Sequence, residues 1–229
     1  MTVRAESLTL TEYVRTALRA DILSGQIGHG QPLRLEALMQ RFDVSRSVVR
    51  EVLIGLTEEN LVVANPNKGF RVIDISSEGL TDLVTLRMVL EPEALARSIE
   101  LGDAEWEAGI IAANHILDRV DDSASHIWGR SEKWVLAHMG FHEALCAACG
   151  NPRMISLMNA LRKESAIYYQ VRITAGHGEP EGIARDIRAE HRELMELAIS
   201  RDAEGAIALL KEETWRTAEI LRQSLDAGA

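Results

Sequence analysis

The chain of 229 residues carries 35 Asp and Glu against 25 Lys and Arg, giving a formal net charge of -10, and 46% of its residues are hydrophobic. These values are typical of a globular protein with a substantial core, and they exclude a chain that is disordered over long stretches. No apolar run approaches the roughly 20 residues that cross a bilayer, and the N-terminal stretch lacks the apolar core of a signal peptide. We therefore expect a cytoplasmic protein with no membrane partner.

The acidic excess is unevenly distributed along the chain. Residues 1–75 hold nine basic and nine acidic side chains, whereas residues 76–229 hold the other 16 basic and 26 acidic ones. This difference predicts two domains, a neutral one over 1–75 and an acidic one over 76–229. A neutral domain with outward-facing arginines is compatible with nucleic-acid binding even though the whole chain is acidic.

The first domain is predicted to contain three helices followed by a β-hairpin. The helices are expected over residues 9–24, 33–42 and 45–60, because capping residues, turn residues and apolar periodicity bound them there. Two strands are expected over 61–64 and 70–73, joined by a turn rich in Asn, Pro and Gly. This order is that of a winged helix-turn-helix, whose hairpin lies against the DNA backbone or the minor groove.

The third of these helices has the layout of a recognition helix. Ser45 can cap its N-terminus, and Arg46 and Arg50 are spaced i, i+4 on one side of it. The other side is an apolar stripe with helical periodicity: Val49, Val52, Leu53 and Leu56. An ordinary amphipathic surface helix would show the same pattern, so its neighbours in the chain decide between the two readings.

Together, the residues of this domain resemble the GntR family of transcriptional regulators. The resemblance rests on five stretches: Ile22-x-x-Gly25, Gly30-x-x-Leu33, Val44-Ser45-Arg46-Ser47-x-Val49-Arg50-Glu51-x-Leu53, Leu56-x-x-Glu59-x-Leu61-Val62 and Lys68-Gly69-Phe70-x-Val72. Two positions depart from the family pattern, since Val48 stands in place of Pro and Asn60 in place of Gly.

The resemblance implies contacts with double-stranded operator DNA. The residues implied are Ser45, Arg46, Ser47, Arg50, Lys68 and Gly69, and Arg34 is a further candidate for a phosphate contact. For the arginines of the third helix, the guanidinium fork matches O6 and N7 of guanine in the major groove. Lys68, at the tip of the wing, suits a phosphate. For Arg34, a solvated surface charge is an equally good explanation.

The second domain is predicted to be an all-α antiparallel helical bundle, so that the fold class of the whole chain is mainly α. Helices are expected over six segments separated by turn or capping residues: 77–100, 103–120, 131–149, 152–174, 181–200 and 202–226. A helical domain behind such a head resembles the FadR-like branch of the family, whose C-terminal FCD-type domain binds a ligand. We therefore expect the second domain of this chain, residues 76–229, to bind an effector and to form the dimer.

Four polar side chains fall inside the apolar stripes of this bundle. His138 and His142 lie one turn apart on the third of its helices, His191 lies on the fifth and Glu213 on the last. Three imidazoles and a carboxylate between helices suit a divalent metal, with zinc expected and nickel, manganese or iron as alternatives. Each histidine taken alone is more simply explained by a separate core hydrogen bond, but four inward polar residues on three helices favour a common site.

Metal-binding FadR-like domains supply a comparison for these four residues. Phe141-His142 and Glu190-His191 match the family pattern, whereas His138 stands where the family has Asp and Glu213 where it has His. The resemblance therefore implies that a carboxylate and an imidazole have exchanged places and that the ligand set keeps three His and one acid.

A small carboxylate is the expected effector, because a metal with open coordination positions binds carboxylate oxygens and a nearby arginine neutralises the remainder. Arg87 resembles the arginine of the family motif Arg-x-x-x-Glu, although an i, i+4 ion pair with Glu91 explains it equally well. Arg162 and Tyr169 are further candidates for lining the cavity.

These features predict a ligand-responsive regulator, expected to be a repressor, that binds a palindromic operator as a homodimer. Two other classes remain open at this point. One is a metal-dependent hydrolase, since the same ligands can activate water. The other is a helical ligand-binding module whose head no longer binds DNA.

Overall fold

The computed structural model describes residues 9–66, 68–121, 132–174 and 186–227. The chain forms two compact units, Met1–Ile75 and Ser76–Ala229. Among the described residues, no helix is long and apolar enough to cross a membrane.

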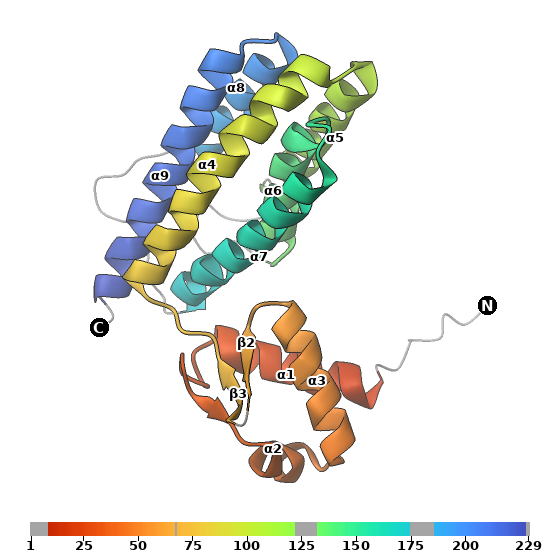
Figure 1. Ribbon diagram of the computed structural model, residues 1–229, viewed down its shortest axis with the longest axis vertical. Helices are drawn as coiled ribbons and strands as arrows, with labels where there is room; N and C mark the ends of the chain where they lie inside the picture. Colours follow the sequence, from red (N-terminus) through yellow and green to blue (C-terminus); the bar gives the residue numbers. More distant parts are fainter. Residues whose placement is uncertain (1–8, 67, 122–131, 175–185, 228–229) are drawn as a thin grey trace, which may run out of the picture. The chain divides into compact units, whose positions relative to one another are not determined.

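The first unit contains three helices and a small sheet. The helices are α1 (Leu10–Leu23), α2 (Leu35–Phe42) and α3 (Arg46–Glu58), and the strands are β1 (Pro32–Leu33), β2 (Val62–Asn65) and β3 (Gly69–Val72). The strands pair antiparallel in the order β1-β3-β2. In Figure 1, β2 and β3 form the hairpin that follows α3. The predicted winged helix-turn-helix is confirmed.

The expected start of the second helix at residue 33 is wrong. The backbone of Leu33 pairs with Phe70 in β3, and its side chain is buried in the core of the unit. Pro32 favours an extended backbone, and α2 begins only after Arg34, which has the extended conformation of an N-cap residue. The wing is therefore a three-stranded sheet that includes the segment before α2.

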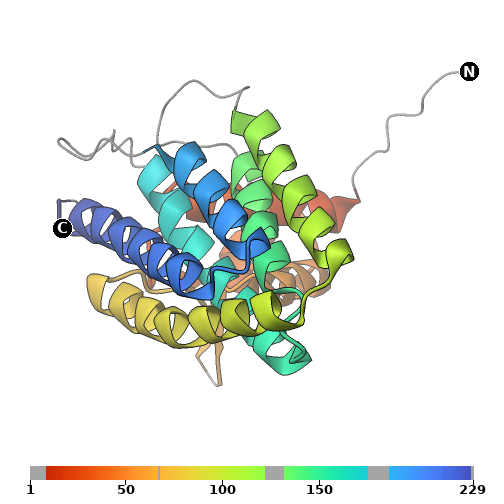
Figure 2. The same cartoon turned by 90° about the horizontal axis from the view of Figure 1, so that it is seen from above.

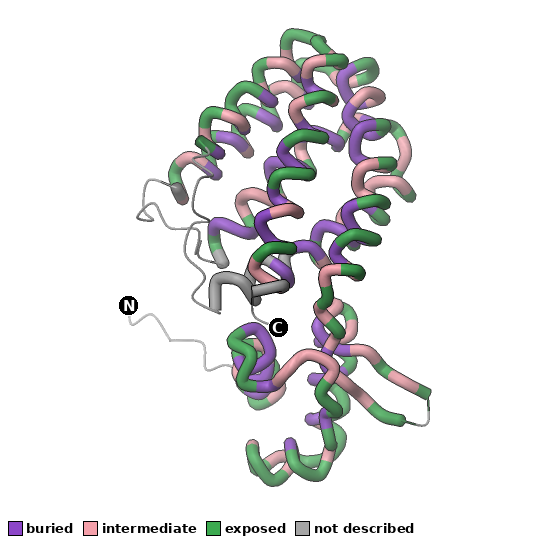
Figure 3. Tube along the Cα trace, turned by 90° about the vertical axis from the view of Figure 1, so that its left-hand side faces the viewer, coloured by how far each residue is buried: buried purple, intermediate pink, exposed green. Residues whose placement is uncertain are grey.

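The apolar side of α3 anchors the helix in the unit. Val49, Val52, Leu53 and Leu56 are all buried, as the periodicity predicts, and they pack with the buried face of α1. In Figure 3, the buried positions of this unit lie on the inner sides of its helices. The opposite side of α3, which carries Arg46, Ser47 and Arg50, is exposed.

The second unit is a bundle of long helices. The described part comprises α4 (Ser77–Leu101), α5 (Ala104–Asp121), α6 (Glu132–Cys146), α7 (Pro152–Thr174), α8 (Ile187–Ile199) and α9 (Ala203–Ala227). The longest two, α4 and α9, lie side by side in the two views of Figures 1 and 2. The all-helical prediction is confirmed. Part of the segment expected to be helical from 181 lies outside the described residues, and α8 begins at Ile187 behind the cap Asp186.

Candidate metal centre and DNA-binding surface

Three helices of the bundle bring together the four polar residues singled out above. His138 and His142 come from α6, His191 from α8 and Glu213 from α9, and one ligand atom of each lies within 4.8 Å of the others. The carboxylate is at the centre, because its Oε1 is 2.9 Å from Nε2 of His191, 3.4 Å from Nε2 of His142 and 3.7 Å from Nε2 of His138. The two imidazoles of α6 have their Nε2 atoms 3.2 Å apart.

The separations of 2.9 to 3.7 Å around the carboxylate and between the α6 imidazoles are close to those in the ligand shell of one metal ion. Ligands at about 2.1 Å from an ion lie roughly 3.0 to 3.4 Å from one another in octahedral or tetrahedral geometry. His142, His191 and Glu213 are buried, and the side chain of His138 is 16% exposed on the side of a small cavity. The residues present therefore fit a divalent ion with a position open toward the cavity.

The charge states of the cluster favour metal binding. Burial lowers the pKa of His138 well below its ordinary value, and it also lowers the pKa of His142, so both imidazoles are neutral near pH 7. Burial alone would raise the pKa of Glu213, but His142 and His191 hold it well below its ordinary range. Neutral imidazoles and an ionised carboxylate are the forms that bind a metal.

Aromatic rings fix the orientation of the imidazoles. Trp134, one turn before His138 on α6, stacks on it with ring centroids 4.6 Å apart and planes 20° from parallel. Phe141 packs against His142 and His191 with centroid distances of 5.4 and 5.1 Å. The rings have little freedom to rotate away from the cluster, which lowers the entropic cost of assembling a ligand shell.

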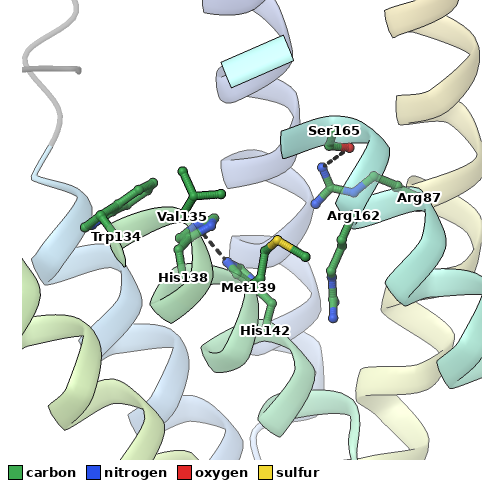
Figure 4. A pocket seen from close by; sticks show the side chains of 8 residues that line it. All are labelled: Arg87, Trp134, Val135, His138, Met139, His142, Arg162 and Ser165. Carbon is green, nitrogen blue, oxygen red and sulfur yellow. Dashed lines mark hydrogen bonds between the residues drawn. The ribbon is translucent and has the colours of Figure 1, made fainter. Parts of the chain in front are cut away.

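A cavity of about 30 Å³ opens beside the cluster, lined by Arg87, Trp134, Val135, His138, Met139, His142, Arg162 and Ser165. Figure 4 shows Trp134 and His138 on one side of it and Arg87 with Ser165 on the other. The space accommodates one or two water molecules. A larger occupant requires a lining side chain to move, and Met139 is the most adaptable of them.

Both candidate arginines line this cavity and share one carboxylate. Arg87 donates to Glu91 at 2.8 Å and to the hydroxyl of Ser165 at 3.2 Å, so the two interpretations of this arginine are compatible. Arg162 donates to the same Oε1 of Glu91 at 3.1 Å. Its Nη1 is buried with no hydrogen-bond partner among the described residues. Two guanidinium groups against one carboxylate leave a net positive charge beside the cavity.

Several lining residues were not foreseen from the sequence, and one candidate stays untested. The side chain of Tyr169 lies outside the described part, whereas its neighbour Tyr168 is buried. Ser165, Met139 and Trp134 carry no signal that separates them from core residues. The pairing of Arg162 with Glu91 joins residues 71 positions apart and cannot be read from local spacing.

The exposed side of α3 displays the residues assigned to DNA. Ser45 caps the helix by accepting from the backbone N–H of Val48 at 3.4 Å, and its hydroxyl lies 2.8 Å from that of Ser47. The side chain of Arg46 forms an ion pair with Glu36 of α2. Arg50, one turn further on, is exposed and forms no ion pair with any residue that the structure describes.

The remaining DNA candidates lie on the wing and before α2. Lys68 and Gly69 are exposed at the turn between β2 and β3, and Gly69 has a left-handed φ of 81° that favours glycine. Arg34 is exposed at the N-terminus of α2. All three can reach a nucleic-acid backbone without rearranging the core.

Comparison with known proteins gives matches over both units. Residues 10–72 match the model of the bacterial regulatory proteins of the gntR family, and residues 82–213 match that of the FCD domain. The uncharacterized HTH-type transcriptional regulator BphR of Paraburkholderia xenovorans is 35% identical over 94% of this chain and 86% of its own length. The HTH-type transcriptional repressor GlaR of Escherichia coli is 27% identical over 91% of this chain and 94% of its own.

Solved structures give the same architecture. A GntR family regulator from Pseudomonas syringae pv. tomato superposes with a TM-score of 0.55 and 26% identity, over 96% of this chain and 87% of that one. McbR/YncC of E. coli superposes with a TM-score of 0.68 over 95% of this chain and 99% of its own, at 20% identity, and so supports the fold alone.

Proposed function

Because the chain belongs to the GntR family of bacterial transcriptional regulators and carries the FCD domain, we propose that it is a repressor controlled by a small carboxylate bound at a metal in its helical bundle. The family makes it a DNA-binding transcriptional regulator and not a metal-dependent hydrolase. Repression is proposed because GlaR, similar to this chain over nearly its whole length, is a repressor.

The observation that carries the metal proposal is the convergence of four ligand atoms from three helices. His138, His142, His191 and Glu213 would hold the ion, and a bound divalent ion would supply positive charge and a coordination position for an oxygen ligand. Separate core hydrogen bonds would not require the three Nε2 atoms to gather around a single carboxylate oxygen. Helices α6, α8 and α9 bring these groups together in the bundle.

The charge around the cavity supports a carboxylate effector. Arg87 and Arg162 present guanidinium donors along the cavity wall, and these two arginines outnumber Glu91. A carboxylate placed between the cluster and these donors would be charge-neutralised at both ends. The small volume favours a compact acid, and Met139 or another lining side chain must move to admit it.

On the DNA side, we propose that a homodimer presents two copies of α3 to the two halves of a palindromic operator. Arg46 and Arg50 would contact base edges or phosphates, Ser45 and Ser47 would contact the backbone, and the wing residues Lys68 and Gly69 would add a phosphate contact, as would Arg34. One head contacts too few base pairs to select a site in a genome, whereas two heads double the half-sites.

The test of the DNA-binding surface is an electrophoretic shift with fragments from the region upstream of the chain's own gene. Replacement of Arg46 and Arg50 by Ala is expected to abolish the shift while the circular dichroism spectrum stays unchanged. The double variant Arg153→Ala/Lys163→Ala removes two exposed positive charges from α7, so it is the charge-matched control and should leave the shift intact. Unaltered binding by the double variant contradicts the proposed surface.

The test of the metal centre is metal analysis followed by titration of chelator-treated protein with zinc and nickel. We expect one ion per chain in the untreated protein and saturable binding on titration. A metal-free preparation that binds neither ion contradicts the proposed centre and leaves the DNA-binding proposal unaffected.

A further inference from the structure

The ion pair between Arg46 and Glu36 joins the two helices of the helix-turn-helix at the surface assigned to DNA. Glu36 is the second residue of α2, and Arg46 is the first residue of α3. The Nη2 of Arg46 donates to Oε1 of Glu36, and both side chains are about two-thirds exposed, at 66% and 68%. Nothing in the core requires this pair, since neither side chain contributes to apolar packing.

A carboxylate at this position is costly for simple DNA binding. Each phosphate is negative, and a carboxylate beside a DNA-facing arginine repels the backbone and cancels part of the attraction that the arginine supplies. An exposed ion pair also adds little to folding stability. Glu36 also lies in the first turn of α2, where a carboxylate stabilises the helix dipole, but that role does not require an arginine partner.

From this geometry we infer that Glu36 is a specificity-determining residue, which holds the guanidinium of Arg46 for one base and keeps it from phosphates. The inference rests on the proposed contact between Arg46 and DNA. An unrestrained arginine has many rotamers and can bind a phosphate as readily as a base, and a phosphate contact carries no sequence information. With one amino group bound to Glu36, the donors left on the fork can still meet O6 and N7 of a guanine.

The comparison with Arg50 sharpens this assignment. Arg50 lies one turn further along α3 and forms no ion pair with a residue in the described segments. Two arginines on the same face are thus held differently, one restrained by a carboxylate and one unrestrained. We expect the restrained arginine to contribute mainly sequence discrimination and the unrestrained one to contribute mainly affinity.

The experiment starts from duplexes that the wild-type protein selects from a randomised pool. Dissociation constants are measured at one salt concentration for the selected site, for the same site with each guanine replaced in turn, and for unselected DNA. The variants are Glu36→Gln, Arg46→Ala and the double variant. Glu58→Gln removes an exposed carboxylate from the other end of α3 and serves as the charge-matched control.

Wild-type protein should discriminate about five- to 150-fold against replacement of the guanine that Arg46 contacts. In Glu36→Gln, this discrimination should fall below about threefold, while binding to unselected DNA should tighten about three- to tenfold. In the Arg46→Ala background, Glu36→Gln should have no further effect on discrimination at that base pair. Glu58→Gln should leave discrimination as it is in the wild type.

Two outcomes would overturn the inference while leaving the proposed function intact. One is that Glu36→Gln tightens binding to selected and unselected DNA by the same factor, which is the result of charge removal alone. The other is undiminished discrimination at the base pair that Arg46→Ala identifies. If Arg46→Ala changes no base preference at all, the proposed contact itself is wrong, and the role of Glu36 is refuted with it.

Discussion

At the scale of single residues, Glu91 has a strongly constrained charge near the cavity. It is buried between Arg87 and Arg162. Burial alone would raise its pKa, but the two guanidinium groups lower the pKa of Glu91 from 4.5 to about 2. A carboxylate of this kind binds its proton more weakly in the folded state than in the unfolded state, and stability therefore depends on pH.

We predict that the bundle loses stability as pH falls from 4.5 towards 2, by on the order of 3 kcal/mol for Glu91 alone. The contribution is fully present above the unfolded pKa and disappears as pH falls through the folded one. Denaturant unfolding at a series of pH values measures it as the difference between wild type and Glu91→Gln. At neutral pH, Glu91→Gln should be less stable by about 3 to 5 kcal/mol, because it takes the carboxylate away from the buried guanidinium of Arg162 and from the partly buried one of Arg87. A constant difference between the two proteins from pH 7 to pH 2 contradicts the assignment.

Glu213 supplies a second prediction at this scale. Glu213→Gln keeps the shape of the side chain and removes the only carboxylate of the four-residue cluster, so zinc affinity should fall by more than about 100-fold. Calorimetric titration measures it. Glu212→Gln is the matched control, because Glu212 is the preceding residue of α9 and is exposed. The zinc affinity of this variant should equal that of the wild type.

A site residue could be predicted from the sequence when the pattern that reveals it lies within its own helix. His138, His142, His191 and Glu213 were recognisable because polar residues interrupt apolar stripes, which periodicity reveals helix by helix. The partners of Arg162 and Arg46 were not, because Glu91 and Glu36 lie on other helices. Their pairing depends on how the helices pack, and no spacing along the chain encodes it.

At the scale of elements, the seam between α4 and α7 is closely packed at the start of α4. A Cβ added to Gly79 would lie 3.0 Å from the hydroxyl of Tyr168 and 3.2 Å from Oγ of the capping residue Ser76. Gly109, inside α5, has nothing within 4 Å of the same position. Alanine substitutions at these two glycines therefore distinguish the effect of helix propensity from the effect of packing.

We predict that Gly109→Ala stabilises the bundle by about 0.5 to 1 kcal/mol, because alanine has the higher helix propensity. Gly79→Ala should bring no such gain, because its new methyl group overpacks the seam between α4 and α7. The free energies of unfolding of the two variants should therefore differ by about 1 to 2 kcal/mol. Thermal unfolding of both variants measures the difference. Equal stabilisation would mean that Tyr168 gives way without cost.

Helices were predicted more reliably than the sheet. Caps and apolar periodicity located α3 and the bundle helices to within a few residues at most ends, because both signals lie within the helix itself. The two-residue strand β1 was missed, since Leu33 is extended only through its pairing with Phe70, 37 positions later. Pairing with so distant a residue leaves no recognisable pattern in the sequence around Leu33.

At the scale of the whole molecule, the two units should respond differently to metal. An ion that binds only the folded cluster stabilises the unit containing it by about 2.7 kcal/mol at a concentration 100 times the dissociation constant. We predict that zinc or nickel raises the unfolding temperature of the bundle and leaves that of the winged head unchanged, as measured by calorimetry. Glu213→Gln should abolish the shift, and an equal shift of both transitions would contradict a site confined to the bundle.

The stacking of Trp134 on His138 has a practical consequence for all of these measurements. An indole in face-to-face contact with an imidazole changes its emission when that imidazole changes its bonding, and the two rings are held nearly parallel. Of the other three tryptophans, Trp106 packs in the core near Ala144 and Trp215 is exposed, so these two should contribute a constant background, and Trp128 lies outside the described residues. The protein thus carries an intrinsic optical probe of its cluster, and Trp134→Phe would identify which part of the signal it supplies.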